Sequence, residues 1–520
     1  MKNKKFCITT PIYYINGEPH IGHAYTNVAA DVLARYMRMR GESVYFLTGT
    51  DEHGQKIEKA AGESGEDDVK VFCDSIVSKF IGLWDILNIS YDDFIRTTEF
   101  RHEETVKNIL SFLYKEGYIY ESNYEGWYCM PCETFWIESQ VENKICPDCG
   151  RELEFITEKN YFLKVSEYRD WLRGYLEDNK DFILPQSRFN EVISFLENPL
   201  TDLCISRPKE RVSWGITLPF DDDYITYVWF EALLNYITAP GFLREDDSFK
   251  SIWPADVQFM AKDILRYHAV YWPIMLHMLG LELPAMVFSH GWWLIEREEG
   301  IDKMSKSKGN VVDPRELIDR YSTDALRYFL LREVPFGMDG NFSESSFIKR
   351  VNSDLANDFG NLVFRTLNMI VKYYDGIIPE SKKAVNSCDE FFSFKIASIY
   401  EKIEESMKVV NYHNVLEVIW ELISAANKYI EVKAPWKLKK EDPDELAYVI
   451  YTLSDVIRIV LIALTPFIPE STQKAWSYFG YKDKVKEHDY SEISSWGKVP
   501  FNQVVEKGEP LFPRIEVEDQ

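Results

Sequence analysis

The sequence predicts an α/β fold in which a doubly wound parallel sheet is split by an inserted segment and followed by an α-helical bundle. Strand and helix patterns alternate over residues 5–115 and return after residue 213. Between them, residues 116–212 are rich in aromatic side chains and carry two close pairs of cysteines. Long apolar periodicities in the last third of the chain predict a bundle of helices over residues 351–374, 390–410, 412–434 and 444–466.

These patterns divide the chain of 520 residues into five predicted segments. They are 1–115, the first half of the sheet domain; 116–212, the inserted domain; 213–315, the second half; 316–350, a linking segment; and 351–520, the helical domain with a C-terminal tail. Residues 376–386 are expected to form a loop between helices, and the chain after about residue 485 is expected to be irregular.

Charge and hydropathy narrow the class of protein. The net charge of −25 argues against an unspecific nucleic-acid coat, which would be basic, although a local basic patch could still bind RNA. No apolar run approaches the roughly 20 residues that a membrane span needs, and the N-terminal residues lead into a strand without the pattern of a signal peptide. We therefore expect a cytoplasmic protein that does not associate with membranes.

The first strands and helix collect polar groups at one edge of the predicted sheet. A strand over Phe6–Tyr14 is followed by a loop and by a helix from about Ile21 to Arg40, which Gly41 ends. A second strand begins at Ser43 and runs into the polar segment Thr48–Gly54. Ligands of open α/β sheets bind at the carboxyl ends of such strands. Later strands are expected at Thr226–Phe230, at Val257–Met260 with a helix through Leu279 behind it, and at Met286–His290.

Two C-x-x-C pairs in the inserted segment predict a structural zinc site. Cys129 and Cys132 are followed, after thirteen intervening residues, by Cys146 and Cys149, and Gly150 permits a tight turn. Four thiolates at this spacing complete a tetrahedral Zn²⁺ shell with no open position. Two disulfides, unligated thiols and a redox-active pair are the alternatives.

Two short runs predict a site for a nucleoside triphosphate. His20 and His23 lie three residues apart at the expected start of a helix, where backbone N–H groups attract phosphate. Lys303 and Lys306 fall in a small polar loop after a strand, and mobile ammonium groups there could neutralise pyrophosphate. A solvated basic loop is the alternative for the lysines.

The runs Pro19-His20-Ile21-Gly22-His23 and Lys303-Met304-Ser305-Lys306-Ser307 closely resemble the two signatures of class I aminoacyl-tRNA synthetases. Residues 262–273 are similar to the methionine-specific members of that family, although the family usually has glycine at the position of Ala261. The resemblance implies a Rossmann-like catalytic domain, whose inserted domain often carries a zinc knuckle.

For catalysis, the resemblance implies that His20 and His23 stabilise charge on the α-phosphate of ATP and that Lys303 and Lys306 neutralise the departing pyrophosphate, with Mg²⁺ accompanying ATP. Asp263 would accept hydrogen bonds from the ribose hydroxyls, although it could instead cap a helix. The implied ATP-binding set is His20, His23, Asp263, His290 and Lys306.

A site for methionine needs an anion for the α-ammonium group and apolar or aromatic walls for the thioether. Asp51, near the end of the second strand, supplies an anion. Ile264, His268 and Trp272 recur every four residues, a stripe that is also typical of a helix packed in a core. By the resemblance, the methionine site is lined by Ile12, Tyr14, Asp51, Trp229, Ala232, Leu233, Tyr236, Ile264, His268 and Trp272, with His268 near the sulfur.

The helical segment carries side chains suited to an RNA loop. Residues 428–440 hold five lysines against one glutamate, and amides, a guanidinium and a tryptophan can read and stack unpaired bases. Solvent-facing or packed amides and a buried tryptophan are the alternatives. The resemblance implies that the CAU anticodon is read by Asn357, Asn361, Arg365, Pro435 and Trp436.

The resemblance covers residues 5 to about 475 and implies a monomer that uses ATP to join L-methionine to tRNA(Met). Two other classes remain open. A nucleotidylyltransferase that adenylates a small molecule would explain the ATP runs but would not need the helical segment. A zinc-knuckle RNA-binding protein would explain the cysteines and the helices but not the ATP runs.

Overall fold

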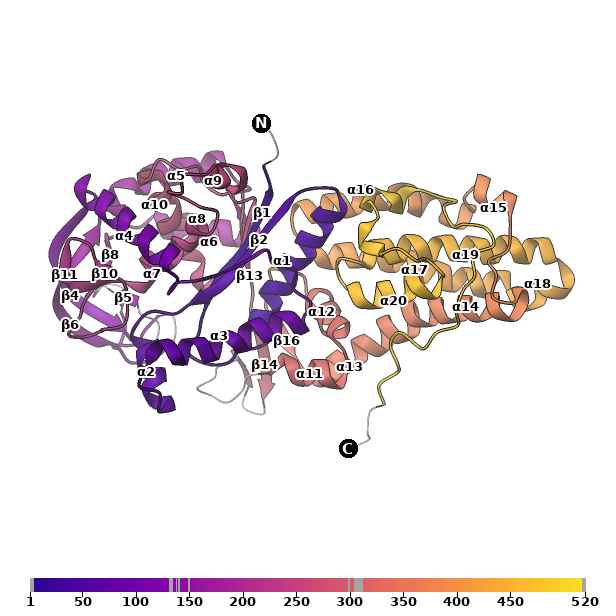
Figure 1. Ribbon diagram of the computed structural model, residues 1–520, viewed down its shortest axis with the longest axis horizontal. Helices are drawn as coiled ribbons and strands as arrows, with labels where there is room; N and C mark the ends of the chain where they lie inside the picture. The colour runs from indigo at the N-terminus through magenta and orange to yellow at the C-terminus, as the bar shows by residue number, and fades with distance from the viewer. Residues whose placement is uncertain are drawn as a thin grey trace. The chain divides into compact units, whose positions relative to one another are not determined.

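The computed structural model describes residues 4–130, 134–136, 138, 141–147, 150–297, 300–303 and 312–516 (Figure 1). The chain forms two compact units. The first comprises Met1–Ala30, Ser43–Asp85 and Tyr91–His290, and the second comprises Asp31–Glu42, Ile86–Ser90 and Gly291–Gln520. The predicted fold class is confirmed, because the first unit holds a parallel sheet with helices and the second is mainly helical.

The first unit is organised by a six-stranded parallel sheet. Its order is β3 (Asp93–Arg96), β2 (Val44–Asp51), β1 (Phe6–Tyr14), β12 (Val257–Ala261), β13 (Val287–His290) and β7 (Ile183–Leu184). The direction in which strands are added reverses between β1 and β12, so the crevice beyond their carboxyl ends is the topological switch point. β7 comes from the inserted segment, which therefore supplies one edge strand of the main sheet.

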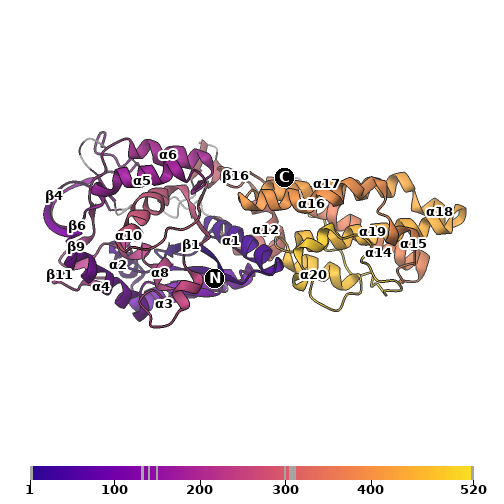
Figure 2. The same ribbon diagram turned by 90° about the horizontal axis from the view of Figure 1, so that it is seen from above.

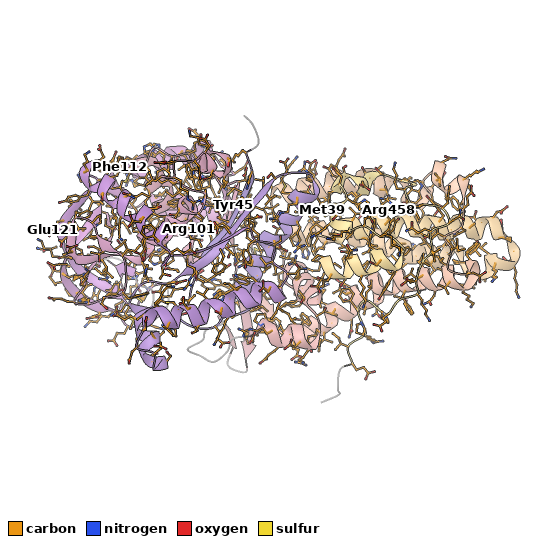
Figure 3. The ribbon with its side chains drawn as sticks, viewed as in Figure 1. Met39, Tyr45, Arg101, Phe112, Glu121 and Arg458 are labelled. Atoms are coloured by element: carbon orange, nitrogen blue, oxygen red, sulfur yellow. The ribbon has the colours of Figure 1, made fainter. Side chains whose placement is uncertain are left out.

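Both faces of this sheet are buried, which explains why its strands are nearly continuous apolar runs. Cys7, Tyr45 and Leu47 belong to one apolar core that includes residues of α4 (Phe100–Lys115) and α10 (Trp272–Met278). Ile8 and Phe46, which point to the other face, are also fully buried. At the edge, Tyr45 and Arg101, labelled in Figure 3, both hydrogen-bond the carboxylate of Asp93.

The first helix, α1 (Ile21–Met39), matches the sequence prediction closely. The four residues expected on its apolar face, Ala24, Val28, Val32 and Tyr36, are at most 2% exposed. Gly41 follows the helix with a φ of 81°, a left-handed conformation that glycine adopts without strain.

The remaining elements of the first unit include an antiparallel sheet of β5 (Thr134–Trp136), β4 (Ile119–Cys129), β6 (Glu154–Leu163) and β8 (Leu203–Cys204), and a smaller one of β10 (Thr217–Leu218), β11 (Asp221–Thr226) and β9 (Ser206–Pro208). The helices are α2 (Gln55–Ser64), α3 (Val69–Ile86), η2 (Val165–Tyr168), α5 (Arg169–Asp178), α6 (Gln186–Leu196), α7 (Val228–Leu233), α8 (Asn235–Thr238), α9 (Ser248–Ile252), η3 (Lys262–Ile264) and η4 (Tyr267–Tyr271).

Two sequence predictions near the switch point are wrong in detail. The strand expected at Thr226–Phe230 is instead the end of β11 and the start of α7, because the β9 partner of β11 ends its pairing at Thr226 and a helical turn begins at Tyr227. The single helix expected after Met260 is a 3₁₀ turn (η3), a π-helix (η4) and the α-helix α10 in succession.

The second unit carries a small sheet and the helical bundle (Figure 2). The sheet contains β15 (Gly300–Lys303), β14 (Trp293–Arg297) and β16 (Gly340–Phe342). The helices are α11 (Pro314–Arg320), α12 (Thr323–Arg332), α13 (Glu344–Arg350), η6 (Val351–Gly360), α14 (Asn361–Tyr374), α15 (Lys382–Asn386), α16 (Glu390–Lys408), α17 (Tyr412–Lys433), α18 (Pro435–Glu441), α19 (Pro443–Leu464), α20 (Pro469–Tyr478), η7 (Val485–Glu487) and η8 (Tyr490–Ser494).

The four long helices that the sequence predicts are present in this bundle, where α17 packs against both α16 and α19. Part of the loop expected at residues 376–386 is instead the short helix α15, which Ser381 caps by accepting a hydrogen bond from the Ala384 N–H. Against expectation, α19 is long and apolar enough to cross a membrane. Its most apolar stretch is 94% buried, as expected of the central helix of a bundle.

Candidate functional site

The strand register brings the polar residues of the first unit to one edge of the sheet. Tyr14, the last residue of β1, pairs with Asp51, the last residue of β2. On the other side of the switch point, Ala261 at the end of β12 pairs with His290 at the end of β13. Residues that lie far apart in the sequence therefore meet at one edge of the sheet.

The two histidines at the start of α1 are held by the backbone of their own loop. Their rings stack with centroids 3.8 Å apart. The backbone N–H of Gly22 donates to Nδ1 of His20 at 3.1 Å, and the backbone N–H of His20 donates to Nδ1 of His23, also at 3.1 Å. Because each Nδ1 accepts a hydrogen bond, the proton of each neutral imidazole resides on Nε2. The loop thus presents two imidazole N–H donors side by side, which suits a phosphate group.

Gly22 is required by the closeness of the His20 ring. A Cβ atom at Gly22 would lie 2.9 Å from Cε1 and 3.1 Å from Nδ1 of His20, so any larger residue would displace the ring. Behind the histidines, Tyr13 contacts the His23 ring edge-on at 4.9 Å and accepts a hydrogen bond from Asn27. The sequence did not single out Tyr13 and Asn27, although both lie in elements next to the histidine run.

The expected nucleoside contacts lie at the ends of β12 and β13. Asp263 is exposed on η3, and Ala261 occupies the N-cap position of that turn, so the alternative that Asp263 caps a helix is wrong. Ala261 has a φ of −81°, an extended conformation in which alanine replaces glycine without strain. His290 is buried, and its Nε2 lies 2.8 Å from the hydroxyl of Thr26 on α1.

Tyr236 and His268 form a buried hydrogen-bonded pair among the residues expected to bind methionine. Nδ1 of His268 lies 3.0 Å from the carbonyl oxygen of Ile264, which can only accept, so Nδ1 carries the proton. The Tyr236 hydroxyl therefore donates to Nε2, 2.8 Å away. Burial lowers the pKa of His268 from the ordinary 6.5 to about 4, so the imidazole is neutral at physiological pH. A neutral histidine and a tyrosine are compatible with a thioether.

The other expected walls divide into two groups. Ala232 and Leu233 of α7 are buried, and Trp229 stacks on Tyr267 with centroids 3.8 Å apart and ring planes 6° from parallel. Trp272 is fully buried and belongs to the apolar core of the first unit. Its indole N–H donates to Gln258 at 3.2 Å, and its ring centroid lies 5.9 Å from that of Tyr236.

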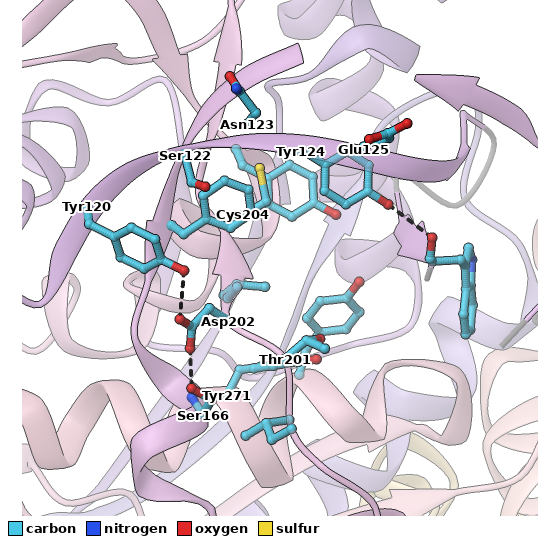
Figure 4. A pocket seen from close by; sticks show the side chains of 16 residues that line it. Tyr120, Ser122, Asn123, Tyr124, Glu125, Ser166, Thr201, Asp202, Cys204 and Tyr271 are labelled. Carbon is cyan, nitrogen blue, oxygen red and sulfur yellow. Dashed lines mark hydrogen bonds between the residues drawn. The ribbon is translucent and has the colours of Figure 1, made fainter. Parts of the chain in front are cut away.

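A pocket of about 420 Å³ lies in the first unit and is lined partly by the inserted segment (Figure 4). Tyr267, the stacking partner of Trp229, is one of its walls, so the pocket adjoins the residues expected to bind methionine. Among the described lining residues the charged groups are Glu125 and Asp202, and Asp202 accepts hydrogen bonds from the Tyr120 hydroxyl and the Ser166 N–H at 2.9 Å. Two carboxylates disfavour a phosphate group in this pocket.

Sequence reasoning missed a buried ionisable cluster behind the methionine walls. His53, two residues after Asp51, lies 2.9 Å from Oε1 of Glu231 on α7, and His102 of α4 lies 3.9 Å from Oε2 of the same carboxylate. All three side chains are at most 5% exposed. The polar run after β2 was a signal for His53, but the pairing with Glu231 spans 178 residues and needs the fold.

Half of the expected zinc site lies within the described residues. Cys129 and Cys146 are buried in a small cluster with Trp136 and Leu153. The N–H of Gly150 donates to the Cys146 carbonyl at 2.9 Å, and Gly150 has a φ of 71°, a left-handed conformation that glycine adopts without strain. Cys132 and Cys149 lie outside the described residues, and the part of the chain that is described contains no group of three or more potential metal ligands.

Of the two lysines expected to act on pyrophosphate, one lies within the described residues. Lys303 ends β15, and only its backbone is described, whereas Lys306 lies outside the described residues.

The residues expected to bind RNA lie in the second unit. Asn357 and Asn361 are exposed, and Arg365 is half-buried on α14. Trp436 is 51% exposed, so the alternative of a buried tryptophan is wrong, whereas Pro435 is buried as the first residue of α18. The ammonium group of Lys439 on α18 lies 5.0 Å from the ring of Tyr373 on α14, which brings these two helices together.

Comparison with known proteins agrees with this arrangement. Residues 6–155 and 149–367 match the family described as tRNA synthetases class I (M), and residues 389–509 match the anticodon-binding domain of tRNA ligase. The chain is 48% identical to the methionine–tRNA ligases of Caldanaerobacter subterraneus and Clostridium tetani, over 99% and 100% of its own length and 80% of theirs.

Among solved structures, the methionyl-tRNA synthetase of Mycobacterium tuberculosis bound by methionyl-adenylate is similar to the chain with a TM-score of 0.91 and 36% identity, covering 98% of this chain and 100% of that one. The apo form of that enzyme is similar with a TM-score of 0.84. The chain belongs to the methionine–tRNA ligase family of class I aminoacyl-tRNA synthetases.

Proposed function

We propose that the protein activates L-methionine with ATP and transfers the methionyl group to the 3′ end of tRNA(Met). The observation that carries this proposal is the pair of Nε2–H donors of His20 and His23 at the switch point, with the neutral Tyr236–His268 pair among the residues expected to bind the side chain. The family assignment supports it, because the relatives are methionine–tRNA ligases.

In the first step, a carboxylate oxygen of methionine attacks the α-phosphorus of ATP. The bond between that phosphorus and the bridging oxygen breaks, and pyrophosphate leaves with the electron pair. His20 and His23 donate hydrogen bonds to the α-phosphate oxygens as negative charge grows there. Asp51 holds the α-ammonium group, and Asp263 and His290 contact the nucleoside. Lys303 and Lys306 neutralise the pyrophosphate, and Mg²⁺ enters with ATP.

In the second step, a hydroxyl of the terminal ribose of tRNA attacks the methionyl carbonyl carbon, and AMP leaves with its phosphate. Most of the rate enhancement in both steps comes from positioning and from donors aimed at developing charge. Trp436, exposed next to the lysines of α18, stacks on an anticodon base, and Asn357, Asn361 and Arg365 read base edges.

The zinc ligands in this proposal are Cys129, Cys132, Cys146 and Cys149. The buried thiols of Cys129 and Cys146 and the turn at Gly150 fit a closed Cys₄ shell. The ion would contribute folding free energy to the inserted segment. Metal analysis is expected to find one Zn²⁺ per chain, and Cys129→Ser should reduce it below half occupancy. Protein that is folded as purified, contains no zinc and has the thiols of all four cysteines free to react would contradict the assignment.

We also propose that the enzyme acts as a monomer in the cytoplasm, where tRNA and ATP are available. Light scattering at micromolar concentration tests the first statement. A mass near 61 kDa is expected, and a mass near twice that value would contradict it.

ATP–pyrophosphate exchange across the amino acids tests the proposed activity. Exchange is expected with methionine and with no other proteinogenic amino acid. Absence of exchange with every amino acid would refute the activity, and exchange with leucine instead would refute the specificity. Lys306→Ala should slow adenylate formation far more than it weakens methionine binding, and equal losses in both would contradict its role.

A further inference from the structure

The first unit contains a buried ion pair for which the two reaction steps have no use. Nδ1 of His53 lies 2.9 Å from Oε1 and 3.1 Å from Oε2 of Glu231. The side chain of His53 is 5% exposed and that of Glu231 is fully buried. Moving charged groups out of water is costly, and a buried carboxylate persists only where its partners are well placed.

The position of the pair in the chain suggests its role. His53 follows Asp51, the expected ammonium ligand, by two residues, in a segment that has already left the β2 ladder. Glu231 is in the middle of α7, a helix of six residues that also carries Trp229, Ala232 and Leu233. The contact between His53 and Glu231 therefore joins the segment that follows Asp51 to the helix that carries the expected apolar walls.

Neighbouring groups hold the pair on both sides. The indole N–H of Trp214 donates to the carbonyl oxygen of Glu52 at 2.6 Å, and its ring lies 5.6 Å from the His53 ring. The N–H of Gly54 in turn donates to the Trp214 carbonyl at 3.2 Å. His102 of α4 lies behind Glu231, 3.9 Å from its carboxylate.

The charges around His53 come from three elements. Burial is the largest single effect and opposes its protonation, but Glu231, Glu103 and Glu52 together outweigh it, so the pKa of His53 is raised above its ordinary value. Burial, with His53 and Arg101 adding to it, lowers the pKa of His102 to about 3, so this second imidazole stays neutral. The proton of the cluster therefore lies between His53 and Glu231.

We propose that the His53–Glu231 pair is a positioning device for methionine, which fixes the distance between the carboxylate of Asp51 and the apolar walls on α7. The inference rests on the proposed function and adds residues that set its substrate fit. The chain between the ammonium group and the sulfur of methionine has a limited reach, so a displacement of one anchor relative to the other weakens binding of the correct side chain.

The test compares Glu231→Gln and His53→Gln with the unsubstituted protein in ATP–pyrophosphate exchange. Each variant is expected to raise the KM for methionine about tenfold while kcat and the KM for ATP change less than about twofold, since only methionine binding depends on this spacing. The double variant should raise the KM for methionine little more than either single variant does, because both substitutions break the same contact. Glu191→Gln, which removes a carboxylate paired with Arg188 at the surface, is the matched control and should leave kcat and both KM values unchanged.

Two readouts remain informative if a variant folds poorly. The ratio of kcat/KM for methionine to that for norvaline, whose side chain is one atom shorter, does not depend on the folded fraction, and it should fall in both variants. In the unsubstituted protein the KM for methionine should rise at the pH where His53 loses its proton, and in Glu231→Gln, where the contact is already broken, this rise should be absent.

An unchanged selectivity ratio and an unchanged pH profile would overturn the inference, as would equal losses in the KM values for ATP and methionine. If the unsubstituted protein shows no exchange with methionine, the proposed function itself fails, which is a different result.

Discussion

At the scale of single residues, the chemistry of the candidate site depends on which ring nitrogens accept hydrogen bonds. Backbone N–H groups fix the tautomers of His20 and His23, and a backbone carbonyl fixes that of His268 in the opposite sense. The first pair therefore offers donors to phosphate, whereas His268 offers a neutral ring that accepts from Tyr236. Under the proposed function, the immediate surroundings of these identical side chains thus suit one pair to a polar ligand and the other to an apolar one.

Gly22→Ala should reduce the rate of methionine-dependent exchange by about tenfold or more, because the added Cβ displaces the His20 ring and misplaces one phosphate donor. The KM for methionine should not change. Gly82→Ala on α3, where no atom lies within 4 Å of the added Cβ, is the control and should keep full activity. Equal rates for the two variants would show that His20 needs no such space.

His268 predicts a pH dependence of stability. Its pKa in the folded protein is about 4, below the 6.5 of the unfolded chain. Between these values the unfolded chain binds more protons, so stability is complete above pH 6.5 and falls as the pH is lowered towards 4, by about 3 kcal/mol in total. Between pH 7 and pH 5, the free energy of unfolding measured with urea should fall less in His268→Gln than in the unsubstituted protein. The same loss in both would contradict the buried neutral state.

At the scale of elements, a buried guanidinium ties together several parts of the second unit. Arg327 on α12 donates to the carbonyl oxygens of Phe467, Leu87 and Pro466 at 2.9–3.1 Å and lies 2.7 Å from Asp31 on α1. Two of these carbonyl groups lie in the turn after α19, the third lies just after α3, and Asp31 lies on α1. Through the contact between Arg327 and Asp31, the C-terminal half of α1 packs with the second unit.

Arg327→Met should lower the free energy of unfolding by about 3–5 kcal/mol, because it leaves buried carbonyl groups and part of the Asp31 carboxylate without their partner. Arg320→Met, which removes an ion pair with Glu344 from a side chain that is 58% exposed, should lower the free energy of unfolding far less, because water screens an exposed ion pair. Chemical denaturation followed by circular dichroism measures both. Similar costs for the two would contradict the structural role of Arg327.

Trp436→Ala should raise the KM for tRNA about tenfold or more, since loss of one stacked base costs about 1–3 kcal/mol, and it should leave ATP–pyrophosphate exchange unchanged. Phe394→Ala, which removes an aromatic side chain that is 76% exposed on α16, is the control. Aminoacylation with varied tRNA concentration measures the effect. An unchanged KM for Trp436→Ala would exclude the tryptophan from the RNA-binding surface.

The sequence predicts elements well where one period extends over many residues. The apolar face of α1 and the strands β1 and β12 are examples, and each forms within a few residues of its predicted bounds. Prediction fails at Val228–Phe230, whose β-branched and aromatic residues favour a strand but lack a partner strand to pair with. It also fails for β7, whose two residues form a strand only because the sheet edge is there to receive them.

For the site, local signals point to candidate residues that are held by their own loop, such as His20 and His23. They do not identify partners that the fold brings together. His53 and Glu231 lie in segments that each look unremarkable, and only the packing of α7 beside the end of β2 makes them a pair. The sequence stripe of Ile264, His268 and Trp272 likewise mixes two roles, since Trp272 is also a core residue.

At the scale of the whole molecule, the residues expected to act in the reaction and those expected to read RNA are spread over the two units, and the second unit, Gly291–Gln520, also includes the positions of Lys303 and Lys306. The first unit holds the expected sites for methionine, the α-phosphate and the nucleoside around one switch point. The second unit holds the expected anticodon residues. With a net charge of −25, the protein must attract tRNA through local basic surfaces such as residues 428–440 rather than through its overall field.

The central claim is that the groups around the switch point of the first unit bind methionyl-adenylate. A crystal structure with a non-hydrolysable methionyl-adenylate analogue tests it most directly. The account predicts the thioether beside Tyr236 and His268, the ammonium group on Asp51, and the group that replaces the phosphate within hydrogen-bond distance of Nε2 of His20 or His23. An analogue bound elsewhere, for example in the pocket lined by Glu125 and Asp202, would contradict it.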